Sequence, residues 1–88
     1  MNSAIIVSAV RTPIAISRKG SLVHTNAEFL ARTVLEASIA RAGIASDLID
    51  DVVFAESLYG GGALARHAAV EAGLMNAAGT AVNRHCAG

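Results

Sequence analysis

The chain has 88 residues, of which 53% are hydrophobic and 3% aromatic, and its seven basic residues balance seven acidic ones. A chain of this length forms at most one small domain and buries a small share of its surface, so we expect marginal stability on its own. The apolar composition excludes a disordered chain, and the balanced charge provides no basic patch for nucleic acid. Because a single cysteine cannot form an internal disulfide, we expect a cytoplasmic protein and not a secreted, disulfide-linked one.

The chain opens with an apolar run at residues 4–10, which is rich in isoleucine and valine. Such a run, ended by Pro13, predicts a central parallel strand that is buried on both faces. The run lacks the basic start of a signal peptide and is too short to span a bilayer. We therefore expect a strand and no association with a membrane.

Residues 14–23 show no clear period and predict a loop with a tight turn at Gly20. The adjacent cations Arg18 and Lys19 could meet a phosphate-bearing substrate, but a solvated loop is the favoured interpretation.

The clearest predicted element is a helix that starts near Thr25. Residues 25–28 (TNAE) have the Thr-x-x-Glu form of a capping box, which satisfies two free amides at a helix start. We expect a helix over 26–42, ended by Gly43. Its polar face is not basic, which argues against a helix on a membrane surface. The polar face carries Glu28, Arg32 and Glu36, and the apolar face carries Ala31, Val34, Leu35, Ser38, Ile39 and Ala42.

The middle of the chain predicts a helical turn or loop over 46–51 and a short strand over 52–55, closed by Glu56. The triple glycine at 60–62 is not followed by a P-loop lysine and lacks the spacing of a dinucleotide fingerprint, so we expect a flexible connection. The nearby aspartates lack the spacing of an EF-hand and are interpreted as solvated turn residues, not as a metal site: Asp47, Asp50 and Asp51.

Residues 63–72 predict a second helix that ends at Gly73. Its alanines permit close packing against another subunit or element. We interpret His67 as a surface or hydrogen-bonded residue and not as a catalyst. The side expected to face the core carries Leu64, Ala68 and Ala72.

A loop over 75–79 and a third strand over 80–83 complete the order strand, helix, strand, helix, strand. This order predicts an α/β fold with a parallel sheet and right-handed crossovers.

The single cysteine, Cys86, lies just beyond the third predicted strand. By composition alone, a lone cysteine is more often a small buried hydrophobic residue. A thiol carried past a strand end, close to free N–H groups at a helix start, is favoured as the thiolate. The small residues Ala87 and Gly88 would let an acyl substrate approach closely, as in a nucleophile elbow. The position therefore suits acyl transfer.

The sequence VNRHCAG at 82–88 resembles the nucleophile motif of thiolases, the acetyl-CoA acetyltransferases and 3-ketoacyl-CoA thiolases. Two earlier segments resemble the same family in the same order. IIVSAVRTP at 5–13 is similar to its opening strand and turn, and ARHAA at 65–69 with AGL at 72–74 is similar to the helix before the motif. One departure is Gly88, which stands where the family usually has serine or alanine.

The resemblance implies a thiolase-like fold, in which a mixed, mainly parallel sheet has flanking helices. It implies that residues 1–88 are an incomplete N-terminal thiolase domain ending at the nucleophile motif, with Cys86 as the catalytic nucleophile. The implied reaction forms or cleaves a 3-ketoacyl-CoA in fatty acid metabolism through an S-acyl cysteine. CoA thioesters are then substrates and no separate cofactor is expected, so acyl-CoA and CoA are the partners. A full-length member is expected to be a homo-oligomer.

In this family, a histidine from a later segment activates the sulfur and a second, late cysteine moves the α-proton. No residue of this chain matches either one. His85 is adjacent to Cys86, but on an extended strand its side chain would point to the opposite face. His24 and His67 have no motif that would place them at the sulfur. We expect the isolated chain to be inactive.

Two alternatives remain open. A ketoacyl synthase shares the cysteine strategy but acts on carrier-protein thioesters, and paired downstream histidines would distinguish it. A non-catalytic polypeptide, either a truncated product or an interaction module, would expose an apolar face and is expected to aggregate or oligomerise.

Overall fold

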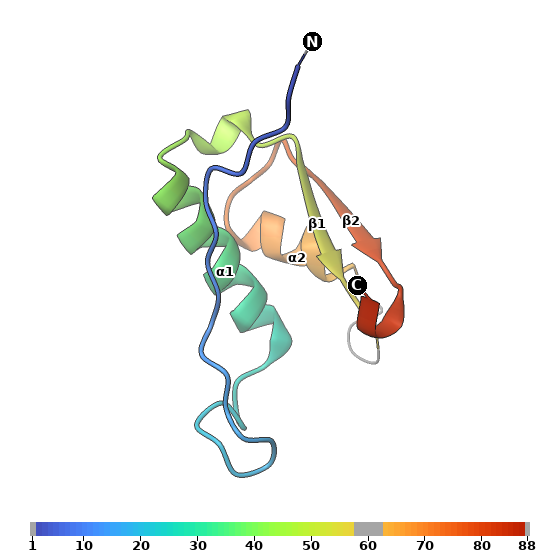
Figure 1. Cartoon of the computed structure of the whole chain (residues 1–88). Helices are drawn as coiled ribbons and strands as arrows, with labels where there is room; N and C mark the ends of the chain where they lie inside the picture. Colours follow the sequence, from blue (N-terminus) through green and yellow to red (C-terminus); the bar gives the residue numbers. More distant parts are fainter. Residues whose placement is uncertain (1, 58–62, 88) are drawn as a thin grey trace.

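The structure is a computed structural model and describes residues 2–57 and 63–87. In chain order it contains helix α1 (Ala27–Ala42), the 3-10 turn η1 (Ser46–Leu48), strand β1 (Asp51–Ala55), helix α2 (Leu64–Glu71), strand β2 (Ala78–Val82) and the 3-10 turn η2 (His85–Ala87) (Figure 1). The expected connection at 60–62 lies outside the described residues.

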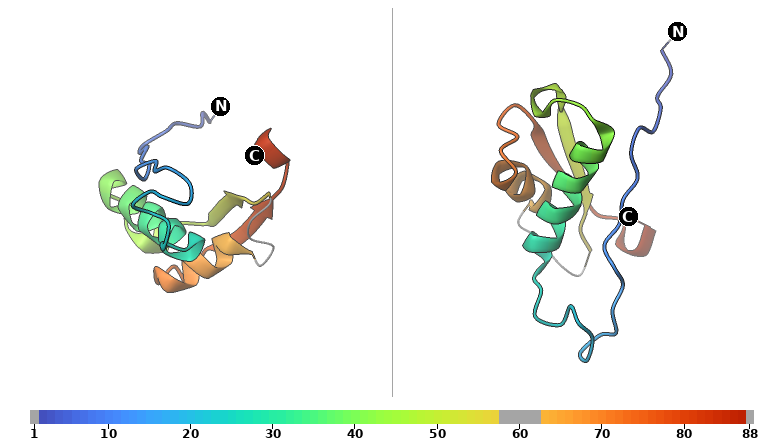
Figure 2. Two further views of the ribbon diagram at one scale, coloured as in Figure 1. Left: turned by 90° about the horizontal axis from the view of Figure 1, so that it is seen from below. Right: turned by 90° about the vertical axis from the view of Figure 1, so that its left-hand side faces the viewer.

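The strand expected over 4–10 is not formed, which corrects the prediction. This segment has no regular secondary structure, and Ile5 and Ile6 are 78% and 89% exposed. A strand needs a neighbour for its backbone groups, and the segment runs beside α1 without joining the sheet (Figures 1 and 2). Within the described residues, the order is therefore helix, strand, helix, strand.

The loop predicted over 14–23 is confirmed. It contains consecutive turns from Ser17 to His24, and the Gly20 amide donates to the Ile16 carbonyl at 2.7 Å. A Cβ atom on Gly20 would lie 2.3 Å from that same carbonyl oxygen, so the turn closes around a residue without a side chain.

The helix predicted over 26–42 is confirmed, but its cap is not the one expected. Asn26 is the N-cap, and its side-chain oxygen accepts a hydrogen bond from the Phe29 amide at 2.8 Å. The capping box that begins at Thr25 is therefore wrong by one residue. The helix ends as predicted at Gly43, whose φ of 70° is the left-handed conformation that glycine adopts without strain.

Strands β1 and β2 form a parallel pair with α2 as the element between them, which confirms the predicted parallel arrangement. The register runs from Asp51 opposite Ala78 to Ala55 opposite Val82, so the two strands end together at one edge. Figure 2 shows α2 on one side of this sheet and the turn η2 on the other.

The core is built mainly from alanine, and these small side chains let α2 pack closely on the sheet. Of the α2 residues expected to face the core, Ala68 is fully buried, and Leu64 and Ala72 are half-buried at its border. Ala65 and Ala69 are also fully buried. The buried apolar residues are Ala31, Leu35, Val52, Ala65, Ala68, Ala69, Leu74 and Ala77.

Among the described residues, no helix has the length and apolar character that a membrane span requires.

Candidate active site

Cys86 lies in a short turn directly beyond the end of β2, as the sequence predicts. The thiol is free and exposed, and among the described residues nothing forms a hydrogen bond with it. The Asn83 side-chain oxygen accepts a hydrogen bond from the His85 amide at 2.9 Å, which closes the turn between the strand and the cysteine. The side chain is thus accessible at the carboxyl edge of the sheet.

The backbone of this turn differs from the expected strand end in two respects. Cys86 lies inside the three-residue turn η2 instead of preceding a helix. His85 has a φ of 51°, so it is left-handed and not extended. The alternation of side chains along a strand therefore does not apply to His85, and that argument for its direction is wrong.

Glu56 is a residue of this region to which the sequence analysis gave only the role of ending a strand. It follows β1 directly, is 7% exposed, and its amide donates to the Val82 carbonyl at 2.8 Å. A small hollow lies between Glu56 and Asn83 at the edge of the sheet. An acidic residue immediately after a buried apolar run is the sequence signal that could have drawn attention to it.

The other two histidines belong to other parts of the fold than Cys86, and neither forms a hydrogen bond with it among the described residues. His24 is exposed in the loop before α1. On α2, His67 Nε2 pairs with Glu71 Oε1 at 3.0 Å, which confirms the interpretation of His67 as a hydrogen-bonded surface residue.

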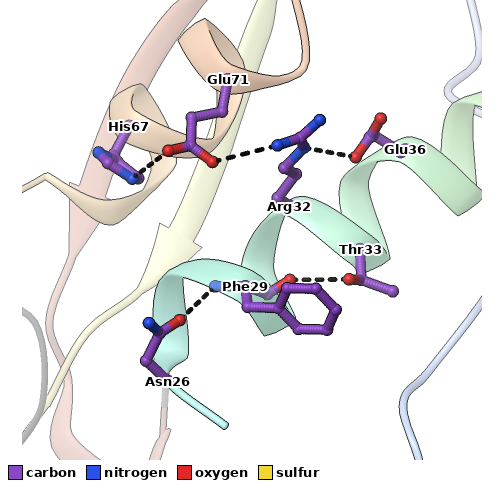
Figure 3. A network of polar contacts seen from close by, with 7 residues as sticks. All are labelled: Asn26, Phe29, Arg32, Thr33, Glu36, His67 and Glu71. Atoms are coloured by element: carbon purple, nitrogen blue, oxygen red, sulfur yellow. Dashed lines mark hydrogen bonds and ion pairs between the residues drawn. The ribbon is translucent and has the colours of Figure 1, made fainter.

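Figure 3 shows that Glu71 also joins α2 to α1. Its second oxygen lies 3.6 Å from the Arg32 guanidinium, which in turn binds Glu36 at 2.8 Å. These side chains are about half exposed, so solvent weakens the ion pairs. The network links α1 to α2. Within the described residues, none of its side chains forms a hydrogen bond or ion pair with the cysteine turn.

The remaining candidates have ordinary surroundings. Arg18 and Lys19 are exposed in a turn, with Arg18 at a φ of 69°. Asp51 accepts hydrogen bonds from the Val52 amide at 2.9 Å and from the Thr80 hydroxyl at 3.4 Å, across the start of the sheet. Over residues 2–57 and 63–87, no three His, Cys, Asp or Glu side chains cluster as metal ligands would.

The arrangement can offer an exposed thiol as a nucleophile, and within the described residues no base forms a hydrogen bond with it. Acyl transfer from a thioester requires a base and donors for the developing oxyanion.

Comparison with known proteins gives a family match over almost the whole chain. Residues 4–88 match the family model described as the thiolase N-terminal domain. The acetyl-CoA acetyltransferase of Escherichia coli strain K12 is 42% identical over 89 residues, covering 98% of this chain and 22% of that protein. The mitochondrial acetyl-CoA acetyltransferase of Mus musculus is 37% identical, covering 99% and 21%, respectively.

Two further similarities extend the comparison. The 3-ketoacyl-CoA thiolase of Shewanella denitrificans is 34% identical, covering 98% of this chain and 24% of that protein. The crystal structure of the Acat5 thiolase from Ascaris suum, in complex with coenzyme A, superposes on 90% of this chain with a TM-score of 0.78 and 26% identity. The chain covers 21% of that structure. It thus spans about a fifth to a quarter of the length of these relatives.

Proposed function

This chain belongs to the thiolase family, and from that premise we propose that the complete protein carrying this sequence is an acyl-CoA acyltransferase. It forms or cleaves a 3-ketoacyl-CoA, with Cys86 holding the acyl group. CoA and acyl-CoA are its substrates, in keeping with relatives named for acetyl-CoA and 3-ketoacyl-CoA and with a similar thiolase in complex with coenzyme A.

The observation that carries the proposal is the position of Cys86. The thiol is exposed in a short turn at the carboxyl edge of a parallel strand pair, within a sequence that matches the thiolase N-terminal domain. In open α/β sheets, this edge is where substrates usually bind. An accessible thiol at this edge is suited to attack a thioester.

In the proposed reaction, the Cys86 thiolate attacks the carbonyl carbon of acyl-CoA. The carbon–sulfur bond to CoA then breaks, and the CoA thiolate leaves and takes up a proton. In the synthetic direction, the carbanion of a second acyl-CoA attacks the S-acyl carbon and frees the cysteine. In the degradative direction, the cysteine attacks the 3-keto carbon, the bond between C2 and C3 breaks, and the C2 carbanion takes up a proton and leaves as a CoA ester. The thiol of CoA then attacks the S-acyl carbon, loses its proton, and the bond to the Cys86 sulfur breaks.

The groups that complete this chemistry are proposed to lie outside the present sequence. The family resemblance implies a later histidine that activates the sulfur and a second cysteine that moves the α-proton. Neither is matched in this chain, where Cys86 is the single cysteine. We therefore propose that the 88-residue chain is inactive by itself.

The test is to incubate the complete protein with acetyl-CoA and to measure its intact mass and that of its peptides. We expect one acetyl group on Cys86 and none on the Cys86→Ser variant, which keeps a similar side-chain volume and should fold normally. Circular dichroism of the variant is the control for folding. Normal acetylation of the variant at another residue would remove Cys86 from the role.

The two alternatives make different predictions. A ketoacyl synthase would be acylated faster by an acyl carrier protein than by acyl-CoA, and the relatives named above favour the thiolase. A non-catalytic polypeptide would leave Cys86 unmodified under the same conditions.

Location and assembly are part of the proposal. We propose a cytoplasmic homo-oligomer. The nucleophilic role proposed for Cys86 needs a reduced thiol, which supports a reducing compartment, and the exposed apolar residues, which an assembly would cover, support the oligomer. The relatives named above include a bacterial protein and a mitochondrial protein. Cell fractionation and light scattering of the complete protein test the two points separately.

A further inference from the structure

Glu56 is a buried carboxylate at the sheet edge from which the cysteine turn emerges. It is 7% exposed and is the one charged residue among those buried in the described ranges. Burying a carboxylate costs free energy unless it is hydrogen-bonded, so the burial of Glu56 must be explained by the groups to which it bonds.

The carboxylate connects the end of β1 to the start of α2. Its Oε2 accepts a hydrogen bond from the Leu64 amide at 2.8 Å. The N-cap residue of α2 is Ala63, which has no side-chain acceptor to offer. Glu56 therefore supplies from another element the acceptor that an N-cap side chain usually provides, and its negative charge suits a helix N-terminus.

The position of α2 in turn constrains β2. A Cβ atom on Gly79 would lie 2.5 Å from the Arg66 Cα atom, so helix and strand are in close backbone contact. The Arg66 guanidinium also donates to the Ala77 carbonyl at 3.2 Å. With so little free space, a displacement of the start of α2 must displace β2 as well.

We propose that Glu56 is a positioning residue for Cys86, an inference that rests on the proposed function above. Its carboxylate fixes the start of α2, and its amide holds the Val82 carbonyl at the last position of β2. Cys86 follows after a turn that is closed by Asn83. Because three residues separate the end of β2 from Cys86, a displacement of the strand end also displaces the thiol.

The experiment uses the complete protein with three substitutions of Glu56. Glu56→Gln keeps an acceptor oxygen at the same reach, Glu56→Asp keeps the charge but is one methylene shorter, and Glu56→Ala removes both. The rate constant for acetylation of Cys86 by acetyl-CoA is followed in a single turnover by mass spectrometry. The KM for acetyl-CoA and the thermal unfolding midpoint are measured for each variant.

We expect the Asp and Ala variants to lower the acetylation rate constant by about tenfold to a hundredfold, because small displacements of a nucleophile have effects of this size. The Gln variant should restore a rate close to that of the wild type. KM should change little, because Glu56 affects the position of the thiol through α2 and β2 and is not proposed to contact the substrate.

Two control variants separate position from stability. Glu71→Gln removes an exposed carboxylate from the same helix and should acetylate normally. Asn26→Ala removes the cap of α1, far along the chain from the cysteine, and should lower the unfolding midpoint without changing the acetylation rate.

Several outcomes would overturn the inference. Wild-type acetylation in Glu56→Ala would do so, as would an equal loss in the Gln and Ala variants or a comparable loss in Asn26→Ala. If Glu56→Ala does not fold, the comparison of Asp with Gln decides. Absence of acetylation in the wild-type protein is a separate result, because it overturns the proposed function and the inference with it.

Discussion

Asn26 sets the start of α1 through one side-chain hydrogen bond, from the Phe29 amide at 2.8 Å. Replacing it by alanine leaves that amide without a partner in the chain. We expect Asn26→Ala to destabilise the complete protein by about 1 kcal/mol, the usual cost of losing such a cap. The measurement is the urea dependence of unfolding, followed by circular dichroism.

Two controls make this prediction specific to the residue. Asn26→Asp keeps an acceptor at the helix N-terminus and should preserve stability. Thr25→Ala should change the free energy of unfolding by less than about 0.5 kcal/mol, as is usual away from caps and cores. A larger loss in Thr25→Ala than in Asn26→Ala would show that the capping box, and not Asn26, starts the helix.

At the residue scale, the sequence predicted those features that local chemistry determines. The position of Cys86 just beyond a strand was predicted, because an apolar run precedes it, and its role as the nucleophile stays a prediction that rests on the motif. The choice between Thr25 and Asn26 could not be settled, because both are good caps and helix ends are ambiguous by a residue. The place of Glu56 after an apolar run could have drawn attention to it, but its bond to Leu64 could not be predicted, because Leu64 is eight residues away and meets it only in the folded chain.

Gly79 is the residue through which α2 and β2 come together. An added Cβ atom would lie 2.5 Å from both the Arg66 Cα and amide nitrogen atoms, which are backbone and cannot rotate away. We therefore expect Gly79→Ala to destabilise the complete protein by about 1–3 kcal/mol, a common cost of overpacking. The thermal unfolding midpoint of the variant, compared with wild type, measures the effect.

Thr80→Ala is the matched control for this prediction, since Thr80 is the next residue in the same strand and is exposed. Its substitution removes only a long, solvent-exposed hydrogen bond to Asp51, at 3.4 Å, and should lower the midpoint much less than Gly79→Ala does. A Gly79→Ala variant as stable as Thr80→Ala would mean that the helix and the strand can separate at no cost.

At the element scale, periodicity predicted α1 well because its apolar positions and its terminal Gly43 agree. The two strands were predicted from short apolar runs, and their parallel pairing follows from the helix between them. The run at residues 4–10 has the same composition, yet it is not a strand in this chain. Composition indicates a tendency to form a strand, while the strand itself requires a partner that the chain must supply.

At the scale of the whole molecule, the core is small. Among the residues that the structure describes, five of the eight buried apolar ones are alanine, and such side chains contribute little apolar area. Several larger side chains are exposed at the N-terminal end of the chain, including Ile14 and Ile16. The larger apolar side chains are thus exposed while the buried ones are small, in a chain that spans about a fifth of the length of the first relatives named above.

This imbalance leads us to expect that the isolated 88-residue chain self-associates, with light scattering after size exclusion showing a mass well above the monomer. Ile5 and Ile6 are 78% and 89% exposed, and an apolar segment without a partner strand is a ready site for pairing with another copy.

The double variant I5S/I6S should therefore shift the chain toward the monomer. Leu48→Ser, at an exposed position in η1 outside this segment, should leave the association unchanged. A stable monomer of the isolated wild-type chain, with cooperative unfolding, would contradict the prediction and show that the small alanine core suffices.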